Sequence, residues 1–148
     1  MPATLIDTNV WLAISFDAHP GHALARQAFQ DTPGSDHWLW SRATQQSYLR
    51  LMATPALHRA YCSPALSNRD ARASLEILLA HPRVLVADEP AEVSDLWLQL
   101  ADHQRPAPKL WMDAYLAAVA IQGGWRLVSF DRDFERFCRA GLQLTPLR

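Results

Sequence analysis

The sequence predicts an α/β fold in which helices cover both faces of a central parallel sheet of four to five strands. Short apolar runs with the length of buried strands alternate with helical segments along the whole chain. This alternation is typical of β-α-β units, in which each helix leads back to the next parallel strand. With 148 residues, 49% of them hydrophobic, the chain is long enough for one domain with one core.

The first half of the chain begins with a buried strand and continues as helices around a second strand. The expected elements are a strand at 3–6, helices at 9–16 and 19–30, a turn at 31–36, a strand at 37–40, a helix at 41–54 and a loop at 58–67. Pro20 suits the start of the helix at 19–30. Pro55 ends the helix at 41–54.

The second half repeats the alternation. The expected elements are a helix at 68–80, a strand at 83–88, a helix at 90–104, a linker at 105–108, a helix at 109–124, a strand at 125–130, a short helix at 131–140 and a candidate fifth strand at 142–147. Either Ser67 or Asn68 suits the cap of the helix at 68–80. Gly123 and Gly124 end the helix at 109–124.

Composition excludes several classes of protein. A net charge of −1 and a pI of about 6.6 exclude a broadly basic surface, so any contact with nucleic acid must use a local cluster. Cys62 and Cys138 form neither a CxxC nor a zinc-binding spacing, and we expect a reducing cytoplasm. The N-terminus lacks the pattern of a signal peptide, and the apolar run at 115–121 is too short to span a membrane.

Carboxylates follow two of the predicted strands. Asp7 comes directly after the first strand, and Asp131 follows the strand at 125–130, with Asp133 two residues later. Asp113 lies in the first turns of an alanine-rich helix that suits close packing on the sheet. Because ligands bind at the carboxyl ends of parallel strands, we expect these side chains to share one site.

Converging carboxylates repel one another unless a cation lies among them. Oxygen ligands suit a hard ion such as Mg²⁺ or Mn²⁺, which keeps several of its waters. An ion held in this way activates water for attack on a phosphodiester. The pattern therefore indicates a metal-dependent nuclease.

Each carboxylate also has an ordinary explanation. Asp7 suits the N-cap of the helix that begins near Asn9. Asp113 is favourable near any helix N-terminus because of the helix dipole. Of Asp131 and Asp133, we expect Asp133 to cap the short helix at 131–140. Only the joint placement of these residues favours a metal site.

The segments LIDTNVWLA, DAYLAAVA and RLVSFDRDF resemble, in order and spacing, PIN-domain ribonucleases, specifically the VapC toxins of bacterial toxin–antitoxin modules. The resemblance covers nearly the whole chain. It implies a PIN-like three-layer α/β/α fold, a single PIN domain over 1–148, and endonucleolytic cleavage of RNA with Mg²⁺ or Mn²⁺. It also implies a VapB-type antitoxin as partner and a homodimer.

The resemblance assigns roles to individual residues. Asp7, Asp113 and Asp131 correspond to the catalytic metal ligands, and Asn9 and Thr44 to supporting residues. Asp133 corresponds to a further acid or to the helix cap.

The chain departs from the family pattern in the helix after the second strand. Many PIN nucleases carry a glutamate just past a threonine there, whereas Thr44 is followed by the neutral Gln45, Gln46 and Ser47. The sequence does not decide which of Gln45, Gln46 and Ser47 takes the glutamate position. One fewer negative charge implies weaker metal binding and puts a second metal ion in doubt.

Basic and aromatic residues give weaker indications. Arg50, on the helix at 41–54, is a candidate contact for RNA phosphate, and an ordinary surface arginine is the alternative. The same two interpretations apply to the local cluster of Arg59, Arg69 and Arg72. The tryptophan-bearing segments at 11–16 and 95–100 suit either core packing or a dimer or antitoxin surface.

Two other functions remain open at the level of sequence. A PIN-like module that binds RNA or protein with weak catalysis is consistent with the missing glutamate. An unrelated α/β phosphohydrolase, such as the haloacid dehalogenase type, requires a second aspartate two residues after Asp7, where Asn9 stands. No GxGxxG follows the first strand, which argues against dinucleotide binding.

Overall fold

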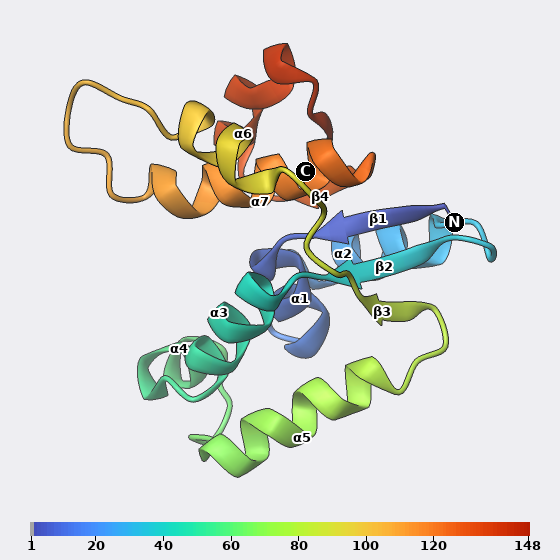
Figure 1. Ribbon diagram of the computed structural model, residues 1–148. Coiled ribbons are helices and arrows are strands. Elements are labelled where there is room, and N and C mark those ends of the chain that lie inside the picture. The colour runs from blue at the N-terminus through green and yellow to red at the C-terminus, as the bar shows by residue number, and fades with distance from the viewer. Residues whose placement is uncertain (1) are drawn as a thin grey trace.

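The computed structural model describes residues 2–148, and over these residues it contains a sheet of five parallel strands (Figure 1). The strands are β1 (Ala3–Ile6), β2 (His37–Trp40), β3 (Val84–Val86), β4 (Arg126–Ser129) and β5 (Gln143–Pro146). Their order across the sheet is β3-β2-β1-β4-β5, and all neighbours pair in parallel. The predicted α/β class and the fifth strand are confirmed.

The strand order changes direction between β1 and β4. From β1 the chain builds outward to β2 and β3, and it then returns to the other side of β1 to add β4 and β5. In open parallel sheets, the crevice at the carboxyl ends of two such strands is the usual place for a ligand. Asp7 follows β1 and Asp131 follows β4, so this crevice lies between two of the candidate residues.

Helices cover both faces of the sheet, and Figure 1 shows α6 and α7 on one side and α1, α3 and α5 on the other. Leu5, Leu39 and Leu127 point toward the first core, which also contains α6 (Val93–Leu100), α7 (Leu110–Gly123) and η1 (Arg132–Ala140). Alternate residues of the same strands point toward the second core. The helices of that core are α1 (Thr8–Ser15), α2 (His22–Asp31), α3 (Arg42–Met52) and α5 (Asn68–Leu79).

The helix α7 packs closely on the sheet because its buried side chains are small. Ala114, Ala117 and Ala118 are fully buried against the first core. The helix ends at Gly124, whose φ of 69° is the left-handed conformation that glycine adopts without strain. This packing fixes the N-terminal turn of α7, which carries Asp113, beside the sheet.

The structure corrects several predicted boundaries. The loop expected at 58–67 begins later, because α4 (Pro55–Ala60) forms from Pro55 at a first-turn position that suits proline. The helix predicted at 90–104 spans only Val93–Leu100, after Glu92 in a left-handed conformation. The segment at 131–140 is a 3₁₀ helix. Ser67 is the cap of α5, where it forms a capping box with Asp70.

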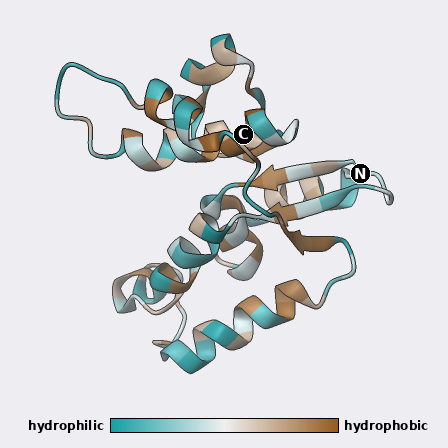
Figure 2. Cartoon of the chain, in the orientation of Figure 1, coloured by the Kyte–Doolittle hydropathy of each residue, from teal (hydrophilic) through white to brown (hydrophobic). Residues whose placement is uncertain are grey.

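The two tryptophan-bearing segments differ in burial. Trp11 is buried and stacks on Trp40, with ring centroids 4.0 Å apart, so the segment at 11–16 belongs to the core. Leu98, Trp111 and Met112 are each about half exposed on α6 and α7. In Figure 2 apolar colour lies on the strands and also reaches the α6–α7 region. Within residues 2–148, no helix combines the length and the hydropathy needed to cross a membrane.

Candidate active site

Asp7 ends β1 and begins α1, and it serves as the N-cap of that helix. Its Oδ1 accepts a hydrogen bond from the backbone N–H of Thr8 at 2.7 Å, and its Oδ2 accepts one from the Ser129 hydroxyl at 2.7 Å. Burial, together with the smaller effect of the charges of Asp113 and Asp131, raises the pKa of Asp7 to about 6 despite these two hydrogen bonds. The residue is therefore both a helix cap and a carboxylate whose ionised form is disfavoured in the fold.

Ser129 connects the ends of β1 and β4. Besides donating to Asp7, its fully buried hydroxyl accepts from the backbone N–H of Asp131 at 2.9 Å and from Nδ2 of Asn9 at 3.4 Å. These contacts use the one donor and both lone pairs of a hydroxyl. The sequence motifs do not single out Ser129, although a polar residue that ends a buried apolar strand is a signal of this kind.

Asn9 holds the chain segment that follows β4. Its Nδ2 donates to Ser129, and its Oδ1 accepts from the backbone N–H of Phe130 at 3.4 Å. Both contacts join the first turn of α1 to residues that are distant in sequence. Asn9 thus lies where it can support Asp7 and Asp131 without touching a ligand itself.

Asp131 follows β4 and caps η1. Its Oδ1 accepts from the backbone N–H of Asp133 at 2.8 Å, so the expectation that Asp133 is the cap is wrong. The extended backbone of Asp131 aims its carboxylate over the first turn, whereas Asp133 already lies inside the helix. The other oxygen, Oδ2, lies 3.8 Å from Nζ of Lys109, and 26% of the side chain is exposed.

Asp113 lies in the first turn of α7 and is partly buried. Burial raises the pKa of its carboxyl, as do the charges of Asp131 and Asp133, while Lys109 and Arg136 act in the opposite direction. Asp7 and Asp113 therefore experience the charge of Asp131 in common. The structure places the three predicted ligands in one electrostatic environment.

A cleft of about 250 Å³ opens beside Asp7 and Asp113. Its walls come from the start of α1, from α3 and from the start of α7, and its lining residues are Asp7, Thr8, Ala43, Thr44, Ser47, Arg50, Leu51, Lys109, Met112, Asp113 and Leu116. A larger cavity of about 490 Å³ lies between α2 and the starts of β1 and β4, at the opposite end of the strands from these carboxylates. Size alone therefore does not identify the site.

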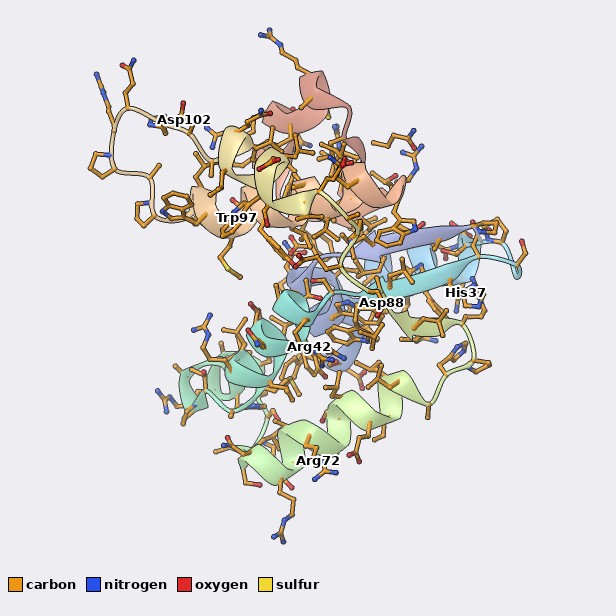
Figure 3. The ribbon with its side chains drawn as sticks, viewed as in Figure 1. His37, Arg42, Arg72, Asp88, Trp97 and Asp102 are labelled. Atoms are coloured by element: carbon orange, nitrogen blue, oxygen red, sulfur yellow. The ribbon has the colours of Figure 1, made fainter. Side chains whose placement is uncertain are left out.

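The wall formed by α3 places the residues that follow Thr44. Thr44 is buried and forms a capping box with Ser41 at the start of the helix. Gln45 is also buried, and its Oε1 accepts from Arg42, which Figure 3 labels at the N-terminal end of α3. Of the three neutral residues, Ser47 is the one that lines the cleft. Arg50 lines it one turn further on.

The donor chemistry fits a partly hydrated hard cation. Within residues 2–148, no three His, Cys, Asp or Glu side chains are grouped so as to hold one ion. Mg²⁺, however, commonly uses only one or two carboxylates and fills its remaining positions with water. The cleft has room for such waters, and Asp7 and Asp113 both face it.

Comparison with known proteins gives a consistent group of relatives. A model of the PIN domain family matches residues 4–140. The chain is 44% identical over 147 residues to ribonuclease VapC41 of Mycobacterium tuberculosis, covering 97% of each protein. It is 32% identical over 139 residues to ribonuclease VapC25 of the same species, covering 90% of this chain and 92% of that protein.

Solved structures share the fold. VapC20 of Mycobacterium tuberculosis, described as a sarcin-ricin loop cleaving toxin, superposes with a TM-score of 0.63 at 24% identity over 94% of this chain and 95% of that one. VapBC2 of Rickettsia felis, bound to a DNA fragment from its promoter, gives a TM-score of 0.69 at 14% identity over 99% of each chain. At these identities the likeness extends to the arrangement of strands and helices.

Proposed function

Because the chain belongs to the PIN domain family, together with the VapC ribonucleases, we propose that it is an endoribonuclease and the toxin of a VapBC-type toxin–antitoxin module. The observation that carries this proposal is the cleft beside the carboxyl end of β1, between the start of α1, α3 and the start of α7. It combines two acids whose pKa values are raised, Asp7 and Asp113, with two cations, Arg50 and Lys109. Acids suit a metal ion, and cations suit the phosphates of RNA.

The reaction proposed is hydrolysis of an RNA phosphodiester with Mg²⁺ or Mn²⁺. Asp7 and Asp113 would hold the ion from the cleft, and the negative charge of Asp131, which acts on both acids, would strengthen the attraction of the site for a cation. A bound divalent ion supplies a Lewis acid that lowers the pKa of a water and offsets charge on the phosphate. The protein contributes a fixed arrangement of carboxylates at the place where that charge develops.

Hydrogen bonds to the carboxylates set that arrangement. Thr8 and Ser129 each donate to one oxygen of Asp7, which fixes the plane of the carboxylate. Ser129 also holds the backbone of Asp131, so the two acids are oriented through one hydroxyl. Asn9 holds Ser129 and Phe130 in place. On the α3 wall, Thr44 stabilises the first turn of the helix. Arg50 faces the cleft from the same helix, and we propose that Arg50 binds RNA phosphate.

The direct test is cleavage of single-stranded RNA by the purified protein in Mg²⁺ or Mn²⁺, and in EDTA. We expect cleavage with either ion, none in EDTA, and a loss of at least about 100-fold in the Asp113→Asn variant, as for the loss of a charge-stabilising group. The matched control is Asp95→Asn, which changes an exposed acid in the first turn of α6. Equal cleavage by Asp113→Asn and the wild type would remove the assignment of Asp113.

A weakly catalytic RNA- or protein-binding module is the second candidate, and the neutral Ser47 on the α3 wall favours it. Calorimetry with Mn²⁺ separates the two. Saturable binding that is lost in Asp113→Asn supports the nuclease, and the absence of binding to the wild type supports the module. The phosphohydrolase alternative gains no support, because Asn9 is engaged with Ser129 and Phe130.

Protein partners are proposed from the family and from one surface. A VapB-type antitoxin and a second copy of this chain are the expected partners of a single PIN domain over 1–148 in the cytoplasm. Leu98 on α6 and Trp111 on α7 are exposed apolar side chains, and Trp111 lies edge-on to Trp97, which Figure 3 labels. Light scattering of the isolated chain should give twice its mass, and co-expression with a small upstream gene should yield a complex.

A further inference from the structure

Lys109, the single lysine of the chain, lies at the edge of the carboxylate cleft. It directly precedes α7, and its Nζ lies 3.8 Å from Oδ2 of Asp131. That separation is longer than a hydrogen bond, and 81% of the lysine side chain is exposed. A loose, exposed ion pair of this kind contributes little to folding stability. Its position next to a candidate metal ligand therefore calls for a different explanation.

The lysine charge already acts on the acids of the site. Lys109 lowers the pKa of Asp113, against the larger effect of burial and the repulsion from Asp131 and Asp133. It approaches Asp131 directly, and it lines the same cleft as Asp7. A mobile ammonium group on a flexible stem thus occupies the region where a divalent ion would be attracted.

Arg50 faces the same cleft from the opposite wall, on α3. Among the residues described, the ionisable groups that line the cleft are two carboxylates, Asp7 and Asp113, and two cations, Arg50 and Lys109. The charges of these four groups cancel when both acids are ionised. A divalent ion would leave the cleft positive, and a phosphodiester would then be attracted to it.

We propose that Lys109 is an exchangeable counter-ion of this site: it neutralises Asp131 when the cleft holds no divalent ion, and it binds a phosphate group of RNA when it does. The inference rests on the proposed function for the identity of the phosphate ligand. The divalent ion and the ammonium group are attracted by the negative charge of the same carboxylates, so each weakens the binding of the other. Once the ion is bound, repulsion turns the lysine toward the substrate, across the cleft from Arg50.

The first test is calorimetry with Mn²⁺ alone on the full chain. Removal of a competing cation should tighten Mn²⁺ binding, so the Kd of Lys109→Gln should fall about two- to fivefold, which corresponds to the usual strength of an exposed charge pair. The matched control is Arg26→Gln, which removes one positive charge from an exposed position on α2. It should leave the Kd for Mn²⁺ unchanged.

The second test is the salt dependence of binding to a fluorescent single-stranded RNA in Ca²⁺, with the RNA checked on a gel for integrity. Loss of one phosphate contact should weaken binding and reduce the slope of log K against log salt by about 0.7. Lys109→Arg, which keeps the charge, should restore the slope, and Arg26→Gln should keep the wild-type slope. A purely structural role for Lys109 would not change this slope.

A lower Kd for Mn²⁺ and a smaller salt slope for RNA binding together support the proposal, and the absence of either change overturns it. The outcome is independent of the proposed activity, because neither measurement depends on cleavage. If wild-type protein fails to cleave RNA while Lys109→Gln shows both shifts, the counter-ion role stands and the nuclease assignment fails. If the wild type cleaves and Lys109→Gln shows neither shift, the nuclease assignment stands and the counter-ion role is wrong.

Discussion

At the scale of single residues, Asp7 shows how a helix cap and a candidate metal ligand coincide. An N-cap residue needs a side-chain oxygen at the start of a helix, and a metal ligand at the end of a parallel strand needs an oxygen in the same place. Asp7 satisfies both, with Thr8 on one oxygen and Ser129 on the other. The cost of this arrangement appears in its pKa, which burial raises to about 6.

The raised pKa gives a prediction for stability against pH. Well below pH 3.8 the Asp7 carboxyl is protonated in both the folded and the unfolded chain, and it adds no penalty. As the pH rises through about 6, ionisation favours the unfolded chain, whose carboxyl has the ordinary pKa of 3.8, so stability is lost. In EDTA at pH 8, Asp7→Asn should therefore be more stable than the wild type by about 1 to 3 kcal/mol.

Urea unfolding at pH 8 and at pH 4 measures this difference. Asparagine keeps the cap through its Oδ1, while its Nδ2 replaces the oxygen that accepts from Ser129, so one lost hydrogen bond reduces the gain from removing the charge. The gain should be present in full at pH 8 and much smaller at pH 4, because the difference is lost as the pH falls from about 6 to below 3.8. A variant less stable than the wild type at pH 8 would show that ionisation of Asp7 is not a penalty in the fold.

Ser129 gives a second prediction at this scale. Ser129→Ala removes the donor to Asp7 and leaves Asn9 and the backbone N–H of Asp131 without their acceptor. Unpaired buried polar groups of this kind cost about 1 to 3 kcal/mol. Thermal unfolding should show that loss, and the Kd for Mn²⁺ should rise as well. Ser94→Ala, at an exposed position of α6, is the control, and equal behaviour of the two variants would contradict the orienting role.

At the scale of elements, the strands and their acids could be predicted, while local helix geometry could not. β1 and β4 are apolar runs that end in Asp7 and near Asp131, and pattern alone reveals them. The sequence suggested Asp133 as the cap of η1, yet the extended backbone of Asp131 decides the cap. The helix α4 was not predicted, because Pro55 ends one helix and begins the next.

Ser47 on α3 allows a test of the glutamate that this chain lacks and many PIN nucleases carry. Ser47 lines the cleft, whereas Gln46 on the same helix is exposed. Ser47→Glu should tighten Mn²⁺ binding about tenfold, as expected for one added carboxylate near a divalent ion in a wet cleft. Gln46→Glu adds the same charge outside the cleft and should have little effect. Calorimetry with both variants checks this, and equal Kd values for the two would place the glutamate position elsewhere.

At the scale of the whole molecule, strand order decides where the site forms. Residues near positions 7, 113 and 131 become neighbours because β4 pairs with β1 rather than with β3. A single sequence does not contain that order in any local pattern, so the strand order was not predicted. The role of Ser129 depends on the same pairing, since Ser129 ends β4 while two of its partners, Asp7 and Asn9, follow β1.

Metal binding should stabilise the molecule as a whole. Because an ion held by the folded chain has no comparable site in the unfolded chain, Mn²⁺ at 100 times its Kd should add about 2.7 kcal/mol to the free energy of unfolding. At the same Mn²⁺ concentration the increase should be smaller at pH 5 than at pH 8, because Asp7, with its pKa of about 6, is mostly protonated at pH 5. Urea unfolding with Mn²⁺ and with EDTA at the two pH values measures both effects. An equal increase at pH 5 and pH 8 would exclude Asp7 from the metal site.

The most direct measurement of the central claim is RNA cleavage by Asp7→Asn compared with wild type, in Mn²⁺ at pH 8, with the stability of both proteins measured in the same buffer without metal. We expect a folded variant that is more stable than the wild type, because the buried charge is removed, and that does not cleave RNA, because the proposed metal ligand is lost. Cleavage by Asp7→Asn at the wild-type rate would contradict it.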